Sequence, residues 1–479
     1  CNECNGNRLK KEAGYVKINN KNIFDLINMP LNELQLYFES VKITDRITNE
    51  IISRVKCLND LGLGYLTLNR KSSSLSGGES QRINLATCIG SNLTGSLYVL
   101  DEPSIGLHSY DTQQLIKIIK RLKNLGNTVL VVEHDDEIIK SADHIIDIGP
   151  KAGTFGGQVV AEGSFKKILN SDSLTAKYLN GKIKINESKG IRDSKSKIKI
   201  SGCRENNLKN FNVEIPLNKL VTISGVSGSG KSTLVNRILY PSILNHLDDY
   251  SLKPGEFDNL SGDLEQISFV EYISQKAIGK SSRSNPVTYI KAYDDIRKLF
   301  SSQRESKIRS YKPKHFSFNV DGGRCDTCKG EGTITIEMQF MPDVNLLCDS
   351  CNGKRFKNEI LEIRIKNKNI SDILDLTVDD AIIFFNDLEE NKIAEKLTVL
   401  QKVGLGYIKL GQSSSTLSGG EAQRVKLAYF LRAKTKSNNG LFLFDEPTTG
   451  LHFDDIKKLL KSINELIDNG NSVIIIEHN

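Results

Sequence analysis

The sequence predicts an α/β fold that contains two tandem copies of one domain, and three observations support this prediction. The stretch LGLGYLTLNRKSSSLSGGESQRINLA at 61–86 reappears 342 residues later as VGLGYIKLGQSSSTLSGGEAQRVKLA at 403–428, which indicates duplication of a structural unit. Short β-branched runs such as 128–132 alternate with amphipathic stretches such as 455–467, a pattern typical of α/β domains. A glycine-rich loop, GVSGSGKS at 225–232, lies between a strand-like and a helix-like segment, as in P-loop domains.

Length and composition limit the class of protein further. The chain has 479 residues, enough for two to four domains, with 38% hydrophobic and 26% charged residues. No apolar run approaches the roughly 18 residues that a membrane-spanning helix needs, so we expect a cytoplasmic protein that does not contact a membrane. The net charge of +7 is compatible with binding a polyanion. Because the chain starts at Cys1 and stops just after a strand-like run, we expect a fragment of a longer protein.

The repeat also sets the expected domain boundaries. A second pair of matching stretches, YVLDEPSIGLH ending at His108 and FLFDEPTTGLH ending at His452, follows the first pair in each copy. Between the copies, residues 182–199 are rich in Lys and Ser and poor in apolar residues, as in a solvated linker or an edge strand. We therefore expect the C-terminal part of a first domain at 1–181 and a second domain at 200–479, with an insertion at about 276–400.

The glycine-rich loop matches the full phosphate-binding pattern G-x-x-x-x-G-K-S. Its backbone N–H groups can surround phosphate oxygens, and Gly225, Gly228 and Gly230 let the backbone approach the anion closely. Lys231 can reach the β and γ oxygens of a nucleoside triphosphate, and Ser232 can ligate Mg²⁺. The loop therefore predicts a nucleotide site.

Acidic pairs follow apolar strands in both copies, at Asp101–Glu102 and at Asp445–Glu446. The aspartate of such a pair can hold the metal ion, and the glutamate can polarise an attacking water. His134 and His478 follow the next strand of each copy, where a donor to the γ-phosphate would lie. These residues predict phosphoryl transfer to water.

Six of the nine cysteines form C-x-x-C pairs. Cys325 and Cys328 are separated by nineteen residues from Cys348 and Cys351, which is the spacing of a structural Cys4 zinc site. Such closed sites hold a fold together and rarely catalyse a reaction. We expect Zn²⁺ there, with a hairpin between the two pairs.

The motif LSGGE, at 75–79 and at 417–421, resembles the signature of ATP-binding-cassette proteins. In that family the signature of one half closes over ATP that is held by the other half. The resemblance implies one complete composite site within this chain. Its residues are Gly225, Ser227, Gly228, Gly230, Lys231, Ser232, Thr233, Gln275, Asp445, Glu446 and His478, together with Ser76, Gly77 and Gly78.

The resemblance implies a second, incomplete site as well. It would combine Asp101, Glu102 and His134 with Ser418, Gly419 and Gly420. The sequence contains no second G-x-x-x-x-G-K-S, so we expect the phosphate loop of this site to lie upstream of Cys1.

A cassette with a Cys4 module between its phosphate loop and its signature is similar to the UvrA family, the damage-sensing component of excinuclease ABC. The resemblance extends over nearly the whole chain and includes IGKSSRSNP at 278–286, FSFNVDGGRCDTCKGEG from 316 and CNECNGNRL at the start. It implies tandem cassette ATPase domains with helical signature regions, the first domain being truncated. It also implies a homodimer that recognises damaged double-stranded DNA in nucleotide excision repair and loads a partner protein, the B component of the excinuclease.

Basic residues around the module are candidates for contact with DNA phosphates, which would suit recognition without a fixed base sequence. They are Lys280, Arg283, Arg304, Lys307, Arg309, Lys312, Lys314 and Arg324. Ser274, Ala277 and Ser282 differ from the family pattern, and none of them replaces a catalytic group.

Other classes of protein fit the sequence less well. A relative of the family that serves antibiotic self-resistance stays an alternative. A transporter ATPase or a translation-associated cassette protein would lack the Cys4 spacing. A purely structural role is disfavoured because the complete site has all of its expected groups.

Overall fold

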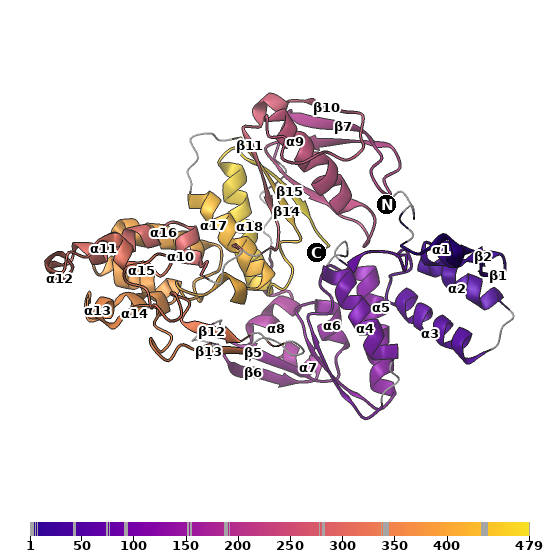
Figure 1. The fold of residues 1–479 in the computed structure, drawn as a ribbon, viewed down its shortest axis with the longest axis horizontal. Coiled ribbons are helices and arrows are strands. Elements are labelled where there is room, and N and C mark those ends of the chain that lie inside the picture. The colour runs from indigo at the N-terminus through magenta and orange to yellow at the C-terminus, as the bar shows by residue number, and fades with distance from the viewer. Residues whose placement is uncertain are drawn as a thin grey trace.

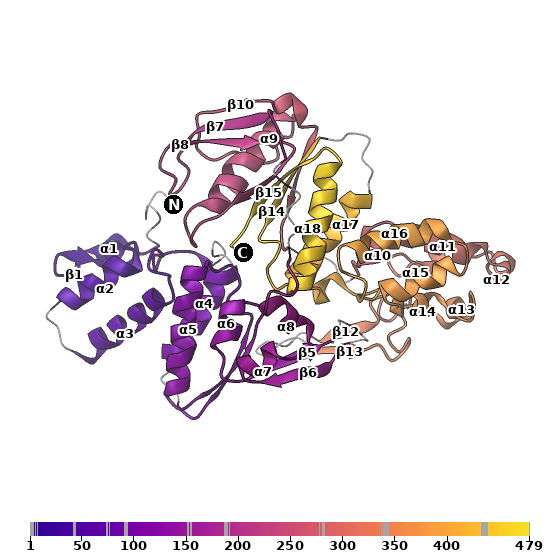
Figure 2. The same cartoon turned by 180° about the vertical axis from the view of Figure 1, so that it is seen from behind.

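The computed structural model describes the chain except at 1–3, 5, 7, 42–44, 73–74, 76, 91–93, 151–152, 154–155, 186–189, 191, 277, 280–282, 337, 339–343, 433–438 and 479. The two halves of the repeat lie against each other near the middle of the molecule. Two helical regions, α1–α3 within residues 23–60 and α10–α16 within residues 286–402, project at its opposite ends (Figures 1 and 2). No helix in the described part of the chain is both long enough and apolar enough to cross a membrane.

The second cassette is built on a parallel sheet with the strand order β11-β14-β15-β9. Its strands are β11 (Phe269–Ile273), β14 (Gly440–Asp445), β15 (Ser472–Ile476) and β9 (Leu220–Ile223). The strands β14 and β15 are almost wholly buried, which explains their uninterrupted apolar sequences. Their side chains alternate between two cores: Phe442 and Phe444 lie in one, and Leu441 and Leu443 in the other.

Helices and a second sheet cover this central sheet. The helices α17 (Gly419–Arg432) and α18 (Phe453–Asp468) lie beside β14 and β15 (Figure 1). The π-helix η4 (Thr233–Leu239) and α9 (Tyr240–His246) contribute apolar residues to the other core. An antiparallel sheet, β10-β7-β8, packs on the same core with β10 (Asn259–Gly262), β7 (Lys197–Cys203) and β8 (Phe211–Pro216). The end of the predicted linker, 197–199, already belongs to β7.

The first cassette repeats part of this plan. Strands β3 (Leu97–Asp101) and β4 (Thr128–Val132) pair in parallel, like β14 and β15. Helices α4 (Gly77–Gly90) and α5 (Ser109–Asn124) correspond to α17 and α18. The half then continues through α6 (Asp136–Ser141), the antiparallel hairpin β5 (Ile145–Gly149) and β6 (Gln158–Gly163), α7 (Phe165–Leu169) and α8 (Leu174–Leu179).

The two faces of the β3–β4 pair differ sharply in exposure. Tyr98 and Val131 are among the residues that pack on the core of the first half. On the opposite face, Leu97 is 64% exposed, Val99 60%, and Leu130 and Val132 are each 49% exposed. The residues at the same places in the second copy are at most 1% exposed, because the core that includes η4 and α9 covers them. They are Leu441, Leu443, Ile474 and Ile476.

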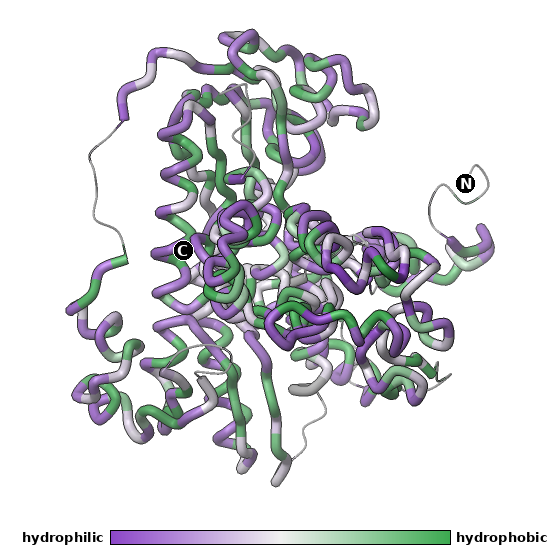
Figure 3. Tube along the Cα trace, turned by 90° about the vertical axis from the view of Figure 1, so that its left-hand side faces the viewer, coloured by the Kyte–Doolittle hydropathy of each residue, from purple (hydrophilic) through white to green (hydrophobic). Residues whose placement is uncertain are grey.

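The regions before the two signatures are helical. In the first half these helices are α1 (Ile23–Ile27), α2 (Leu31–Ser40) and α3 (Arg46–Asp60), after η1 (Lys11–Gly14), β1 (Lys17–Ile18) and β2 (Lys21–Asn22). In the second half the matching helices are α14 (Ile370–Asp375), α15 (Val378–Asn386) and α16 (Asn391–Lys402). Hydrophilic and hydrophobic stretches alternate along the chain, as expected for elements with one buried face (Figure 3).

The insertion of the second half contains further short elements between β11 and α14. Its helices are α10 (Pro286–Tyr289), α11 (Tyr293–Ser302), α12 (Arg304–Ile308), η6 (Pro313–Phe316) and α13 (Asn358–Leu361). Strands β12 (Thr333–Ile336) and β13 (Val344–Leu347) pair antiparallel, which agrees with the predicted hairpin between the two cysteine pairs. The α/β class with two related halves is thus confirmed.

Candidate functional site

The phosphate loop connects β9 to η4, as its sequence context predicts. Lys231 donates from Nζ to the carbonyl oxygens of Gly225 at 2.8 Å and Val226 at 3.0 Å, so its ammonium group lies inside the curve of the loop. Burial lowers the pKa of Lys231, although the carboxylates of Glu446, Asp111 and Asp445 act in the opposite direction. A desolvated cation held in this way is prepared to bind phosphate oxygens.

The acidic pair Asp445–Glu446 ends β14 close to the loop. Tyr272 of β11 donates its hydroxyl to Asp445 Oδ2 at 2.6 Å, and Gln423 donates to the Asp445 carbonyl at 2.7 Å. Burial raises the pKa of Asp445 despite the hydrogen bond from Tyr272. Glu446 adopts a left-handed backbone with φ of 47°, and Glu102 does the same with φ of 44°. Strain of this kind, repeated in both copies, is typical of functional positions.

Each glutamate of the acidic pairs lies beside the histidine that follows the next strand. His478 Nε2 is 3.5 Å from Glu446 Oε1, and His134 Nε2 is 3.6 Å from Glu102 Oε1. Gln275, just after β11, donates from Nε2 to the Glu446 carbonyl at 3.3 Å. The structure therefore brings Gln275, Glu446 and His478 together, as the sequence predicts for a site that handles a water and a γ-phosphate.

Residues of the first half complete this site from the other side. Ser227 of the phosphate loop donates from Oγ to the Gly106 carbonyl at 3.3 Å. A Cβ atom at Gly106 would lie 3.0 Å from Glu446 Oε2, so the loop after β3 approaches the carboxylate closely. The rings of His108 and His478 lie edge to face with their centroids 6.2 Å apart. These contacts bring residues of both halves to Glu446, while the predicted part of Ser76, Gly77 and Gly78 in the site stays a prediction.

The signature residues are placed less completely. Ser76 lies outside the described residues, while Gly77 and Gly78 begin α4. In the second copy, Ser418 precedes α17 and Gly419 begins it. A Cβ atom at Gly419 would lie 3.1 Å from Gln275 Cβ.

The incomplete site shows the reciprocal contact between halves. A Cβ atom at Gly450 would lie 2.8 Å from Glu102 Oε2, just as Gly106 lies against Glu446. Glu102 and His134 are neighbours here, and Asp101 ends β3 beside them. The assignment of Ser418, Gly419 and Gly420 to this site stays a prediction.

Several residues around the two sites were missed at the level of sequence. Glu477 accepts from Thr448 N at 2.8 Å, and Glu133 accepts from Ser104 N at 2.8 Å, so each holds the loop after the acidic pair of its own copy. Both precede the predicted histidine in the shared pattern E-H, and this repetition was the signal that could have identified them. Tyr272 carries no such repeated pattern.

The four cysteines form a buried cluster whose Sγ atoms all lie within 4.8 Å of one another. Cys325 Sγ is 3.9 Å from Cys348 Sγ, and Cys328 Sγ is 3.6 Å from Cys351 Sγ. Four thiolates at about 2.3 Å from a tetrahedral zinc ion would lie about 3.8 Å apart, so the cluster fits Zn²⁺. Burial opposes ionisation of Cys348, but backbone N–H donors from Cys351 and Ser350 outweigh it and lower the pKa of Cys348 to about 7.

The predicted phosphate-contact residues fall into three groups. Some are held in ion pairs: Arg309 Nη1 is 2.6 Å from Glu362, Arg324 Nη2 is 2.7 Å from Asp321, and Arg283 Nε is 3.6 Å from Glu331. Lys280 lies outside the described residues. The remaining four are exposed at the surface of the insertion, and they are Arg304, Lys307, Lys312 and Lys314.

His134 is expected to titrate above an isolated histidine. The hydrogen bond to Glu102 raises the pKa of His134 against the effect of its burial. Since the folded pKa is the higher one, the pair stabilises the fold fully below the unfolded value of about 6.5, and this stabilisation is lost as pH rises through the folded pKa. Histidine-ring NMR across pH 5–9 should show the elevation, and Glu102→Gln should remove it. An unchanged His134 titration in Glu102→Gln would contradict the assignment.

No family model matches the sequence. UvrABC system protein A of Staphylococcus epidermidis is 50% identical over 488 aligned residues, which cover 100% of this chain and 51% of that protein. The protein of the same name from Aquifex aeolicus is 52% identical over 490 residues, with 100% and 52% covered. The crystal structure of UvrA2 from Deinococcus radiodurans is similar with a TM-score of 0.92 and 40% identity, over 100% of this chain and 60% of that one.

The chain thus spans about half the length of the curated relatives it matches. The match covers the whole chain, including both cassettes and the cysteine module, and the solved structure is similar across the same span. The chain belongs to the UvrABC system protein A family.

Proposed function

We propose that the chain binds and hydrolyses ATP at one composite site formed between its two cassettes. The observation that carries this proposal is the position of the Glu446 carboxylate. It lies beside His478 of its own cassette and against Gly106 of the other, in reach of a phosphate loop that itself contacts Gly106 through Ser227. A residue that contacts both halves next to the phosphate loop is suited to couple ATP hydrolysis to closure of the two cassettes.

The residues of the site have distinct roles in this proposal. Lys231 and the loop N–H groups bind the β- and γ-phosphates. Ser232 and Asp445 would hold Mg²⁺, which neutralises charge on the phosphates when bound. Glu446 orients and polarises the attacking water, while His478 donates toward the γ-phosphate and holds Glu446 at 3.5 Å. Gln275 holds the backbone of Glu446 in place by donating from Nε2 to the Glu446 carbonyl oxygen.

The second part of the proposal is that ATP binding and hydrolysis drive recognition of damaged double-stranded DNA in nucleotide excision repair. Membership of the family supports this role, with the B component of the excinuclease as the partner that receives the damaged site, a homodimer as the active assembly and the cytoplasm as its location. The exposed Arg304, Lys307, Lys312 and Lys314 would contact phosphates without reading bases. A lesion lowers the cost of local bending, which lets such contacts discriminate damage.

The test compares binding of the chain to damaged and undamaged duplexes of equal length at fixed salt, with and without ATP. We expect tighter binding to the damaged duplex, on the order of tenfold if the lesion saves about 1.4 kcal/mol of deformation. Glu446→Gln, studied in parallel, should change the preference for the damaged duplex because this variant keeps the chain in the ATP-bound state. Equal affinity for both duplexes in every nucleotide state would rule out the repair function and leave only the ATPase.

A further inference from the structure

The repeat places a tyrosine ten residues before each signature. Tyr65 and Tyr407 end the matching stretches LGLGY and VGLGY. Tyr65 donates its hydroxyl to Glu79 at 2.6 Å, and Tyr407 donates to Glu421 at 2.5 Å. Glu79 and Glu421 are the last residues of the two LSGGE motifs. Burial raises the pKa of both tyrosines, so each hydroxyl keeps the proton that it donates.

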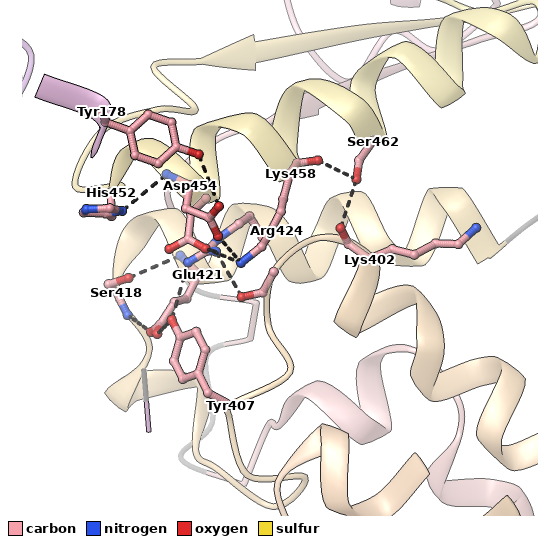
Figure 4. Close-up of polar contacts among 12 residues, drawn as sticks. Tyr178, Lys402, Tyr407, Ser418, Glu421, Arg424, His452, Asp454, Lys458 and Ser462 are labelled. Atoms are coloured by element: carbon pink, nitrogen blue, oxygen red, sulfur yellow. Dashed lines mark hydrogen bonds and ion pairs between the residues drawn. The ribbon is translucent and has the colours of Figure 1, made fainter. Parts of the chain in front are cut away.

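The second copy shows what this glutamate holds in place. Glu421 Oε2 accepts from the backbone N–H of Ser418 at 2.8 Å, and Ser418 Oγ accepts from the Glu421 N–H at 3.2 Å, which forms a capping box at the start of α17. Tyr407 binds the other carboxylate oxygen of Glu421, so one glutamate joins the tyrosine to the signature serine (Figure 4). The same residue types stand at the same spacing in the first copy.

Tyr65 differs from Tyr407 in what its ring contacts. A Cβ atom at Gly228 would lie 2.8 Å from Tyr65 Cζ, so the ring rests directly on the phosphate loop of the other cassette. Gly228 has a φ of 76°, and its carbonyl accepts from Asn207 Nδ2 at 2.9 Å. The loop therefore has little freedom to move without moving the ring. Tyr407 instead has its Cβ 3.0 Å from where a Cβ atom at Gly153 would lie.

We infer that Tyr65 is a positioning residue of the composite site: it links the phosphate loop of the second cassette to the signature helix of the first. The link runs from Gly228 to the ring of Tyr65, from its hydroxyl to Glu79, and from Glu79 into the start of α4. Occupation of the loop by ATP shifts the ring, and the shift reorients the signature over the γ-phosphate. The inference rests on the proposed ATPase function and names one residue that couples the ATP-bound phosphate loop to the signature.

Tyr65→Phe is the decisive variant because it keeps the ring against Gly228 and removes only the hydroxyl. We expect kcat for ATP hydrolysis to fall about tenfold, as for loss of one hydrogen bond to a charged group, with KM for ATP changed less than about twofold. A purely structural tyrosine would lower the melting temperature and leave kcat unchanged. Tyr250→Phe is the control, since Tyr250 is 73% exposed on the surface of the second cassette.

A fluorescence measurement on the full chain separates this inference from the function on which it rests. The sequence contains no tryptophan, so Tyr65→Trp creates a single reporter at the loop. ATP should change its emission, whereas Tyr250→Trp should not respond. Direct binding of a fluorescent ATP analogue to the unsubstituted chain tests the proposed function separately. If the analogue binds but Tyr65→Phe keeps its kcat, the coupling is wrong; if the analogue does not bind, the ATPase proposal itself fails.

Discussion

Glu446→Gln is expected to lower kcat for ATP hydrolysis by about 10²- to 10⁴-fold, the usual loss when a positioned general base is removed. The amide keeps the shape of the side chain but can no longer take up a proton. Its backbone anchors, from Glu446 N to the Ile476 carbonyl and from Gln275 to the Glu446 carbonyl, do not involve the carboxylate. ATP should therefore still bind. Measurements of phosphate release and of nucleotide binding on the same variant will show that hydrolysis is lost while binding is kept.

Two comparisons make this result specific. Glu395→Gln changes the same residue type at an exposed position in α16 and should leave hydrolysis unchanged. Glu102→Gln alters the corresponding residue of the first copy, where the sequence provides no phosphate loop of its own, and should cost less than about tenfold. A Glu446→Gln chain that hydrolyses ATP at a normal rate would show that another residue activates the water.

Replacement of Cys348 by serine is expected to abolish zinc binding and to unfold the module locally. Cys348 is fully buried, and its Sγ lies 3.9 Å from Cys325 Sγ. Structural zinc sites contribute an apparent binding free energy of roughly 10–16 kcal/mol, so the fold around the ion depends on it. Metal analysis should find about one zinc per chain in the unsubstituted protein and none in Cys348→Ser. Hydrogen exchange should rise across 325–351.

Cys57→Ser is the matched control for this experiment. Cys57 lies in α3, donates weakly to the Ala86 carbonyl at 3.7 Å, and belongs to no cluster of metal-ligating residues within the described part of the chain. It should keep the full zinc content. Retention of zinc by Cys348→Ser, or complete absence of zinc from the unsubstituted protein, would contradict the assignment of the module.

The sequence was sufficient wherever a short pattern determines the geometry by itself. A phosphate loop curves because its glycines and its flanking strand and helix require it. The sequence predicted that Lys231 reaches a bound phosphate, and the Lys231 Nζ atom lies inside that curve. The four cysteines could be assigned to one site because two C-x-x-C pairs with this spacing are typical of a structural zinc site. The internal repeat indicated that Glu446 and His478, and likewise Glu102 and His134, belong to one site, and each pair does lie together.

Contacts between the two halves could not be predicted in the same way. The approach of Gly106 to Glu446 depends on how the cassettes pack, and no local propensity or periodicity encodes that arrangement. Tyr65 lies between a signature and a phosphate loop that is more than 150 residues away in the sequence. The repeat contained a signal for its hydrogen bond to Glu79, since Tyr407 occurs at the matching place, but it contained none for the contact with Gly228.

The outward face of the β3–β4 pair has a practical consequence for work with this chain. Leu97, Val99, Leu130 and Val132 together present a contiguous apolar surface on parallel strands, with 49–64% of each residue in contact with water. Exposed apolar surface on a sheet promotes self-association. We therefore expect the chain to form concentration-dependent aggregates, and a charged substitution such as Val99→Lys to improve its solubility without altering ATP turnover at the composite site.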